Sequence, residues 1–331
     1  MLCRPVSISV LVLATPMASK RTLMRLICFI LLCSISIRCF GQTQQQATVD
    51  SELDVGLPQQ MLLDVREPEL SRFKRQALQS VSVSSGWLGE LSAGGVNNAF
   101  LDTSIGTGIP LGSFDNILAV APRFRVDWID APDAIDIPSS LYLVESQLFY
   151  RRPLNSRLNA MGIFSPSLRS DFTTSENAFR VFALGLLNWE AIQDELTLSA
   201  GAVYLGRADL PVLPAVGLSW TPSRRVKLDL RFPESQFAYR LRKNGALSET
   251  WTSIALGIGG NTWAVSRNSG LSDELSLRDI RLTSKLEHII DGGGGWFIES
   301  GYAFARRIEY EQSNSEIQLG DAVILQAGWR Y

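Results

Sequence analysis

The stretch Asp279–Ile290 reads D-I-R-L-T-S-K-L-E-H-I-I, and its apolar and polar residues alternate. Ile280, Leu282, Leu286 and Ile290 stand at even positions, and polar or charged residues fill nearly all the odd ones. Successive side chains of a β-strand point to opposite faces, so this period of two predicts a strand with one apolar and one charged face.

The same alternation recurs from residue 79 to the C-terminus. Leu228 and Leu230, for example, alternate with Lys227, Asp229 and Arg231. The turn signal Asn244-Gly245 lies between two such stretches, and Asn-Gly is a strong hairpin signal. The expected strands span residues 80–91, 99–109, 116–128, 140–152, 157–165, 179–189, 196–205, 214–220, 226–232, 236–242, 250–263, 277–290, 296–310 and 321–331.

Period two alone does not separate a membrane barrel from a soluble β-sandwich. Three features favour the barrel: charges of both signs share one strand face, Ala, Gly and Ser recur on the apolar face, and connections alternate between short and long. Only the turn at 232–236 breaks that alternation. We therefore expect an all-β fold, a closed antiparallel up-and-down transmembrane β-barrel of about 14 strands, with 12 as the alternative, formed by residues 79–331.

The N-terminus has the layout of a sorting signal. Lys20, Arg21 and Arg25 precede the apolar run Leu26–Ile37, which is too short to span a bilayer as a helix. We expect residues 1–41 to be a signal peptide, with residues 1–19 as a possible upstream extension. Residues 42–78 are expected to be a periplasmic leader or linker, or else a plug or partner-binding segment. Within this segment, residues 70–78 suggest a short helix.

Composition excludes several kinds of chemistry. All four Cys lie in the first 39 residues, and the 331-residue chain has one His, His288. A chain without its signal would therefore have no thiol and no multi-His metal site. A net charge of −2 gives no reason to expect a nucleic-acid partner. We expect no cofactor and no metal.

Two segments carry a resemblance to known proteins. The end of the chain, Ala322–Tyr331, resembles the C-terminal assembly signal of outer-membrane barrels, with Leu325, Trp329 and Tyr331 as its signal residues. Pro214–Leu241 is similar to a block in a bacterial family of outer-membrane β-barrels of uncharacterised function. The residues that carry this second likeness are Gly217, Pro222, Val226–Phe232, Pro233 and Tyr239.

These resemblances imply a location and partners. They imply the bacterial cell outer membrane, contact with outer-membrane lipid and insertion by the barrel-assembly machinery. The family brings no established activity, and the sequence gives no oligomeric state.

The charged strand faces are the candidate functional site. By the alternation, the lumen-facing charged residues are Arg123, Arg125, Asp127, Glu145, Lys227, Asp229, Arg231, Arg240, Arg242, Asp279, Arg281, Lys285, Glu287, Glu299 and Arg307. Their basic excess would favour anions in an open pore. The alternative is a lattice of ion pairs that fills the lumen.

Three functions follow from these alternatives. The first is a non-enzymatic barrel, either a small-solute channel or a closed structural barrel. The second is a barrel enzyme or lipid-handling transporter that acts near His288, although no Gly-x-Ser-x-Gly elbow frames a nucleophile. The third is a soluble secreted β protein. The sequence favours the first, and we expect no catalytic residue.

Overall fold

A computed structural model describes residues 70–74, 76–92, 95–112, 116–205, 212–312 and 315–331. The chain divides into the units Met1–Asp64 and Val65–Tyr331, and every described residue belongs to the second. The expected signal peptide 1–41, its extension 1–19 and most of the expected leader 42–78 lie outside the described residues. The short helix expected at 70–78 is not present in the part of it that is described, because β1 begins at Leu78 and no helix precedes it.

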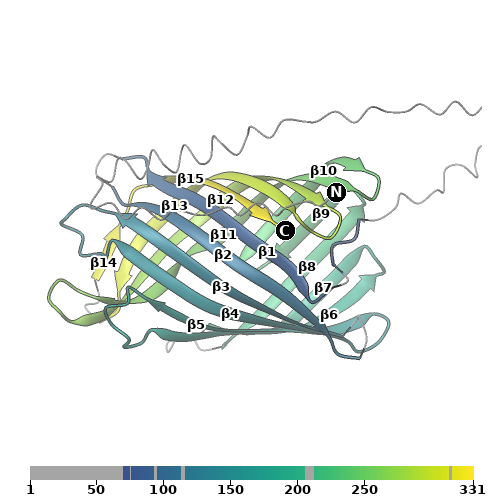
Figure 1. The fold of residues 1–331 in the computed structure, drawn as a ribbon, viewed down its shortest axis with the longest axis horizontal. Coiled ribbons are helices and arrows are strands. Elements are labelled where there is room, and N and C mark those ends of the chain that lie inside the picture. Colours follow the sequence, from purple (N-terminus) through teal and green to yellow (C-terminus); the bar gives the residue numbers. More distant parts are fainter. Residues whose placement is uncertain (1–69, 75, 93–94, 113–115, 206–211, 313–314) are drawn as a thin grey trace, which may run out of the picture. The chain divides into compact units, whose positions relative to one another are not determined.

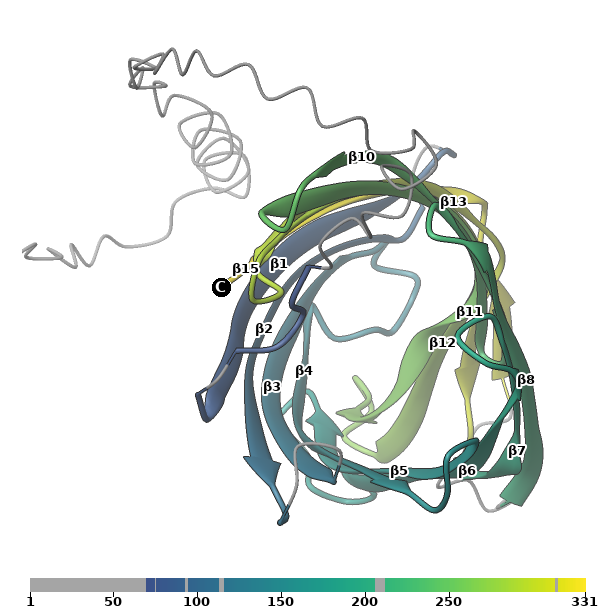
Figure 2. The same cartoon turned by 90° about the vertical axis from the view of Figure 1, so that its right-hand side faces the viewer.

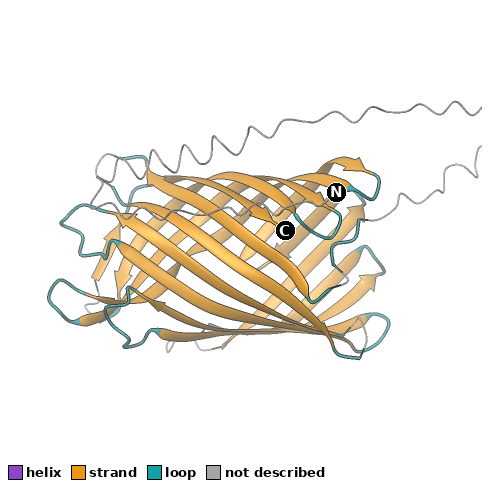
Figure 3. Ribbon diagram, viewed as in Figure 1, coloured by secondary structure: helices purple, strands orange, loops and turns teal. Residues whose placement is uncertain are grey.

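The described residues contain only strands and connections (Figure 3). The strands are β1 (Leu78–Glu90), β2 (Asn97–Pro110), β3 (Ile117–Asp130), β4 (Ser140–Pro153), β5 (Leu158–Ser170), β6 (Phe179–Ile192), β7 (Leu196–Tyr204), β8 (Val212–Ser223), β9 (Val226–Arg231), β10 (Glu234–Asn244), β11 (Ser248–Ser266), β12 (Ser272–Ile290), β13 (Gly295–Tyr310), β14 (Ser315–Gln318) and β15 (Ala322–Arg330).

The strands form a closed antiparallel barrel (Figure 1). Each strand from β1 to β13 pairs with its neighbours in sequence, and β15 closes the ring by pairing with both β13 and β1. Fourteen strands make the ring, as expected, and the 12-strand alternative is wrong. The short strand β14 pairs only with the end of β13. Closure leaves no long unpaired edge on which another chain could add a strand.

The two ends of the barrel differ. The end that holds Leu78 and Arg330, here called the turn side, has short turns such as 224–225 and 245–247. The opposite end, the loop side, has longer connections such as 131–139 and 171–178. The two-residue turn at 232–233 is the exception on that side, as expected from the sequence.

A line of irregular backbone crosses three adjacent strands near the loop side. Gly260 on β11 has a φ of +96°, and a Cβ there would lie 1.9 Å from the Leu277 carbonyl oxygen, so only glycine fits without strain. The β12–β13 register shifts between Arg278 and Ile280, and the extra residue in β13 is Ala305, with a φ of +50°. Bulges of this kind bend a strand and increase its twist.

Beyond this line the hairpin of β11 and β12 contacts strands that are not its neighbours in the ring. We call residues 260–278 the flap. Ala264 on the flap pairs in parallel with Ser170 at the end of β5, and the Ser266 amide donates to Asp171 Oδ2 at 2.9 Å. Arg169 Nη1 donates to Asn261 Oδ1 at 2.9 Å, and Arg180 on β6 forms an ion pair with Glu274.

The flap therefore crosses the loop-side mouth of the barrel. In the view along the barrel, the loop-side parts of β11 and β12 lie inside the ring of strands (Figure 2). On the other edge, β10 pairs with β11 only as far as Gly257. The loop-side mouth is thus divided, with the flap and β1–β5 on one side and β6–β10 on the other.

Candidate functional site: the barrel lumen

Strand pairing decides which side chains face the lumen. On β3, Arg123, Arg125 and Asp127 alternate with Phe124 and Trp128, which are 42% and 39% exposed on the outer face. Because residues paired across two neighbouring strands lie on the same face, the register identifies the inner residues of each further strand around the ring. The predicted residues that it places on the inner face are Arg123, Arg125, Asp127, Glu145, Lys227, Asp229, Arg231, Arg240, Asp279, Arg281, Lys285, Glu287 and Glu299.

Two predicted residues lie on the opposite face and are corrected here. Arg242 pairs with Thr250 on the outer face, because the register shifts between Arg240 and Arg242. Arg307 pairs with Arg278 on the strand face opposite that of Arg306, because of the extra residue Ala305. A one-residue bulge reverses every later side chain of a strand, and alternation in the sequence does not show where it occurs.

The inner face at mid-height holds a cluster of ion pairs around Asp127, which is 0% exposed. Arg125 donates to both of its carboxylate oxygens, from Nε at 2.8 Å and from Nη2 at 2.7 Å. Asn98 Nδ2 on β2 donates to Asp127 Oδ1 at 2.9 Å. Beside this group, Arg123 Nε donates to Asp102 at 3.0 Å.

The same spacing recurs across the lumen on β12. Arg281 Nε and Nη2 donate to the two oxygens of Asp279 at 2.6 and 2.9 Å. Residues two apart share one face of a strand, so Arg-x-Asp or Asp-x-Arg builds an ion pair within one strand. Gly259 on β11 leaves the space for this pair, because a Cβ there would lie 2.0 Å from Asp279 Oδ1.

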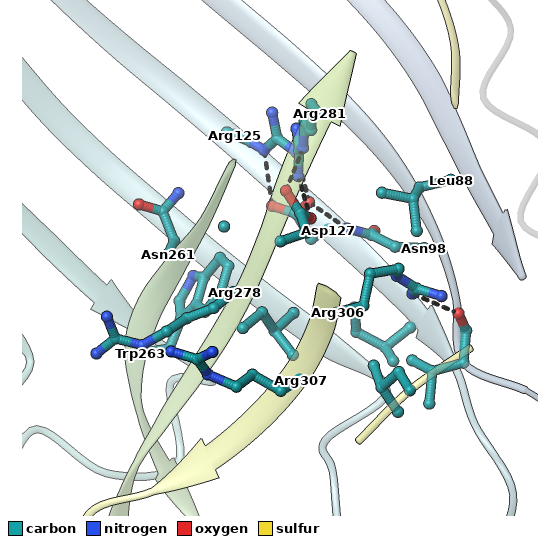
Figure 4. A pocket seen from close by; sticks show the side chains of 16 residues that line it. Leu88, Asn98, Arg125, Asp127, Asn261, Trp263, Arg278, Arg281, Arg306 and Arg307 are labelled. Atoms are coloured by element: carbon teal, nitrogen blue, oxygen red, sulfur yellow. Dashed lines mark hydrogen bonds and ion pairs between the residues drawn. The ribbon is translucent and has the colours of Figure 1, made fainter. Parts of the chain in front are cut away.

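The two ion pairs meet in the middle of the lumen. Figure 4 shows Arg125 and Arg281 with their guanidinium groups close to Asp127, although they come from β3 and β12. The cavity among these side chains has a volume of about 80 Å³. That space is enough for a few water molecules and too small for a sugar or a nucleotide.

Arg306 is an inner-face residue that the sequence analysis missed. It is 4% exposed and pairs with Glu90 at 3.2 Å, and it donates to the carbonyl oxygens of Gly320 and Val96 at 2.7 and 2.9 Å. The Ala305 bulge turns Arg306 inward in place of Arg307. In the sequence, only the adjacent pair Arg306-Arg307 indicated that one arginine faces inward here, and the pair does not show which of the two it is.

The charges of this part of the lumen are largely paired. Arg123, Arg125, Arg169, Arg281 and Arg306 lie with the carboxylates of Glu90, Asp102, Asp127, Glu145 and Asp279. Arg278 and Arg307, which also line the cavity, share the carboxylate of Glu309 at 2.6 Å each. Each of these arginines has a carboxylate within 4 Å, whereas an anion-selective constriction uses unpaired positive charge.

An apolar cluster fills the loop side of the lumen above these ion pairs. Its buried members come from β11–β13, from β3 and β4, and from the connection between β1 and β2. They are Val96, Ile129, Leu141, Trp263, Val265, Leu275, Ile308 and Tyr310. Ile135 and Ile137 of the loop 131–139 pack against them. We call this group the apolar cap.

Polar contacts hold the loop 131–139 on the apolar cap. Arg267 Nε donates to Asp136 Oδ2 at 2.7 Å, the Asn268 amide donates to Asp136 Oδ1 at 3.1 Å, and the Tyr310 hydroxyl donates to the Asp136 carbonyl. Burial alone would raise the pKa of the Asp136 carboxyl. The hydrogen bonds from Arg267 and Asn268 outweigh burial and hold this pKa below its ordinary value.

On the turn side, the described residues before β1 enter the lumen. Leu70 packs against Trp251 and Ile289, and Arg72 forms an ion pair with Glu249 at 3.2 Å. Glu249 also pairs with Arg240 at 3.1 Å. Part of the expected leader therefore lies against the inner wall.

His288 lies on the outer face near the turn side. Its ring stacks on Trp296 with 5.8 Å between centroids, and its Nδ1 lies 3.0 Å from Thr250 Oγ1 in a hydrogen bond. Its partners are thus a threonine and an indole ring. In the described ranges, no three His, Cys, Asp or Glu side chains are grouped so as to hold a metal ion.

The last strand carries the residues of the C-terminal signal. Leu325, Trp329 and Tyr331 are 50%, 52% and 49% exposed, and the first two lie on the outer face of β15. Lys74 Nζ lies 3.4 Å from the centroid of the Tyr331 ring.

Fold and lumen together define a closed antiparallel β-barrel with paired charges inside and apolar side chains outside. The profile of a family described as a domain of unknown function (DUF6268) matches residues 132–319, more than half of the chain, and the chain belongs to this family. The segment Pro214–Leu241 lies within the matched region. No curated protein sequence matches the chain.

Within the described residues, no helix is long and apolar enough to cross a membrane.

We predict that replacing Asp127 with Asn lowers the free energy of unfolding by about 3–5 kcal/mol, because it removes the fully buried carboxylate that holds Arg125 with two hydrogen bonds and leaves Arg125 only the more distant Asp102 at 3.7 Å. Asp229→Asn is the matched control. The pair Arg231–Asp229 has the same spacing, but its side chains are 40% and 30% exposed, so the loss should stay below about 1 kcal/mol. Urea unfolding of the refolded protein measures both losses. Equal losses for the two variants would contradict the central role of Asp127.

We predict that the contact between Asp136 and Asn268 weakens below pH 3.8. A carboxyl whose pKa is lowered by folding stabilises the folded state above its ordinary pKa of 3.8, and this contribution is lost as the pH falls through the lowered value. Hydrogen exchange of the Asn268 amide, corrected for its intrinsic rate, should therefore accelerate below that pH.

The control for this prediction is the Ser266 amide, which donates to Asp171 instead. Burial would raise the pKa of Asp171, but its hydrogen bonds with Thr173 and Ser266 hold the pKa below its ordinary value. Asp136→Asn should remove the acid acceleration at Asn268 and leave that at Ser266. Unchanged exchange at Asn268 in this variant would show that Asp136 does not hold the loop.

Proposed function

We propose that the chain is a non-enzymatic protein of the bacterial outer membrane, a transmembrane β-barrel whose lumen is closed rather than an open porin-like channel. The observation that carries this proposal is the reversed distribution of polarity, with ion pairs enclosed by the ring and large apolar side chains exposed on its outer face. The barrel fold and the family membership are compatible with it and assign no role of their own.

The outer face has the pattern expected at a bilayer. Trp and Tyr side chains that are each at least 38% exposed, together with Phe179, gather at two heights, whereas the exposed Phe124 and Phe164 lie between them. The loop-side group is Trp87, Trp128, Phe179, Tyr204 and Tyr302, and the turn-side group is Trp189, Trp220, Tyr239, Trp296 and Trp329. Transmembrane barrels place such aromatic girdles at the two membrane interfaces.

The band between the girdles is uncharged on the outer face of the described strands. On β11 and β12, for example, the outer positions are Ile254, Leu256, Leu282 and Leu286, each more than a third exposed. A soluble protein of this size would bury these residues in a core. Lipid gives them an apolar environment, and the closed ring pairs the backbone groups that lipid cannot solvate.

Two groups of side chains support a closed lumen. The apolar cap fills the loop side beside β1–β5, and Leu141, Val265, Leu275 and Ile308 within it are 0% exposed. Below it, the ion pairs around Asp127 occupy the middle of the lumen. Electrostatically balanced, packed side chains favour a filled barrel over a water-filled pore.

Sorting to this location remains part of the proposal. It relies on the signal peptide expected at residues 1–41 and on the C-terminal signal residues Leu325, Trp329 and Tyr331. Insertion would require the barrel-assembly machinery as partner.

We predict that Leu256→Arg blocks folding into lipid vesicles, because an arginine near the middle of the outer band costs about 2–4 kcal/mol in a bilayer. Leu271→Arg is the control, since Leu271 is 68% exposed in the loop 267–271, beyond the band. The folded fraction is read from the faster migration of unboiled samples on gels. A soluble barrel would tolerate both substitutions equally, and that result would contradict the membrane assignment.

We predict that the wild-type protein shows no steady single-channel conductance in a planar bilayer, because the apolar cap fills the loop side beside β1–β5 and the ion pairs around Asp127 occupy the middle of the lumen. A general porin run in the same bilayer verifies that the assay detects pores. Regular conductance steps that scale with the amount of folded protein would show an open channel and overturn the closed lumen.

A further inference from the structure

The inner face of the barrel is apolar along one arc near the loop side. The register places Phe182, Leu184 and Leu186 of β6 on the inner face, with Val203 of β7 and Leu213 of β8 beside them. Leu186 and Val203 are 8% and 5% exposed, and the other three are partly buried. We call these five residues the inner apolar wall.

This arc contrasts with the rest of the ring. On β2–β5 and β12, the inner positions at similar height carry Asp102, Arg125, Glu145, Arg169 and Arg281. On β6 the outer positions are apolar too, including Leu187, which is 50% exposed. Lipid accounts for an apolar outer face, but it does not account for an apolar inner one.

The inner apolar wall faces the side of the mouth that the apolar cap leaves out. The cap is built from β3, β4, β11–β13 and neighbouring loops, and none of its members comes from β6–β8. In Figure 2, β6, β7 and β8 form one side of the ring, and the flap lies inside it. Arg180 of β6 contacts Glu274 on the flap, so the wall begins where the flap meets β6.

Polar atoms without partners lie at the β5 end of this wall. Ser165 is 2% exposed, and its hydroxyl has no hydrogen-bond partner among the described residues. Ser165 pairs across the strands with Phe182, the first residue of the wall. The Nε of Arg180, two residues before Phe182, is likewise buried without a hydrogen-bond partner in the described part of the chain. A buried polar group left unpaired costs free energy, so this corner suits a ligand with hydrogen-bonding atoms.

The charges around the corner balance. Arg180 pairs with Glu274, and Arg169 lies 3.8 Å from Glu145. An anionic head group would add an unpaired negative charge beside Glu274, and a cationic one would add a positive charge beside Arg180. A neutral head that accepts from Arg180 Nε and bonds to the Ser165 hydroxyl fits best.

We propose that the inner apolar wall binds a neutral amphiphile, with its acyl chain along Phe182, Leu184 and Val203 and its hydroxyl or ester head at Ser165 and Arg180. This inference rests on the proposed function, because membrane lipids would supply such molecules. It makes the closed barrel a lipid-binding protein on the β6–β8 side. The proposed lipid site is therefore not the one considered near His288, which lies on the outer face near the turn side.

The test is equilibrium dialysis of the full chain in lipid nanodiscs, with empty nanodiscs as the blank. The probes share a ten-carbon chain: radiolabelled 1-monodecanoylglycerol, decanoate and decyltrimethylammonium. Saturable binding of the monoacylglycerol, at least fivefold tighter than that of either charged probe, is expected. Binding no greater than that of the blank would overturn the site, and a preference for decanoate would overturn the neutral head group.

Variants locate the site. Leu184→Asn should weaken binding at least tenfold, while Leu187→Asn on the outer face of the same strand should leave it within twofold. Phe182→Ser replaces Leu184→Asn if that variant does not show the folded band on unboiled gels. Ser165→Ala should weaken binding of the monoacylglycerol about threefold to tenfold, the range of one lost hydrogen bond. Equal effects of the inner and outer leucine substitutions would place the ligand elsewhere.

The two proposals fail in different ways. A wild-type chain that stays soluble without detergent and does not enter nanodiscs would refute the membrane assignment. The same dialysis in buffer would then still decide whether the inner apolar wall binds the probe. A chain that enters nanodiscs and binds nothing would refute the ligand site alone.

Discussion

Closure of the strand ring is the constraint on which the rest of this structure depends. Once β15 pairs with both β13 and β1, every strand of the ring has one face toward the lumen and one face away from it. Charged side chains are then confined to a narrow interior, where they must find partners. The ion pairs of Arg125 with Asp127 and of Arg281 with Asp279 satisfy that requirement within single strands, and the narrow interior brings the two pairs together.

The bend across β11, β12 and β13 determines how the loop-side end of the barrel is arranged. A regular barrel of fourteen strands would leave a wide mouth, and here the flap crosses it. Gly260 permits the bend because its backbone has a positive φ that other residues avoid, and because a Cβ at this position would lie only 1.9 Å from the Leu277 carbonyl oxygen. The loop-side end then divides into a part filled by the apolar cap and a part lined by the inner apolar wall. The closed lumen and the lipid site that we propose both follow from this division.

Much of the architecture was predictable from alternation alone. The expected strands correspond to β1–β13 and β15, and stretches such as 226–232 and 279–290 gave the correct faces because period two relates directly to strand geometry. The expected strands 157–165 and 277–290 were too short, since β5 extends to Ser170 and β12 begins at Ser272. The extension of β5 reaches the flap, where Ser170 pairs with Ala264, and the extension of β12 carries Glu274, which forms an ion pair with Arg180 of β6. They were missed because serine and aspartate, which are common in loops, make up much of both segments.

By itself, the sequence determined the all-β class and which residues of a regular strand share a face, because alternation is a local property of the chain, and it left the ring at about 14 strands with 12 as the alternative. Only the tertiary structure decided what depends on bulges and distant contacts. Arg306 rather than Arg307 faces inward, Arg242 leaves the lumen, and Arg169 meets Asn261 across 92 positions of sequence. A bulge shifts the face of every later residue, and closure joins segments that no local pattern relates, so neither is encoded in any short stretch of residues.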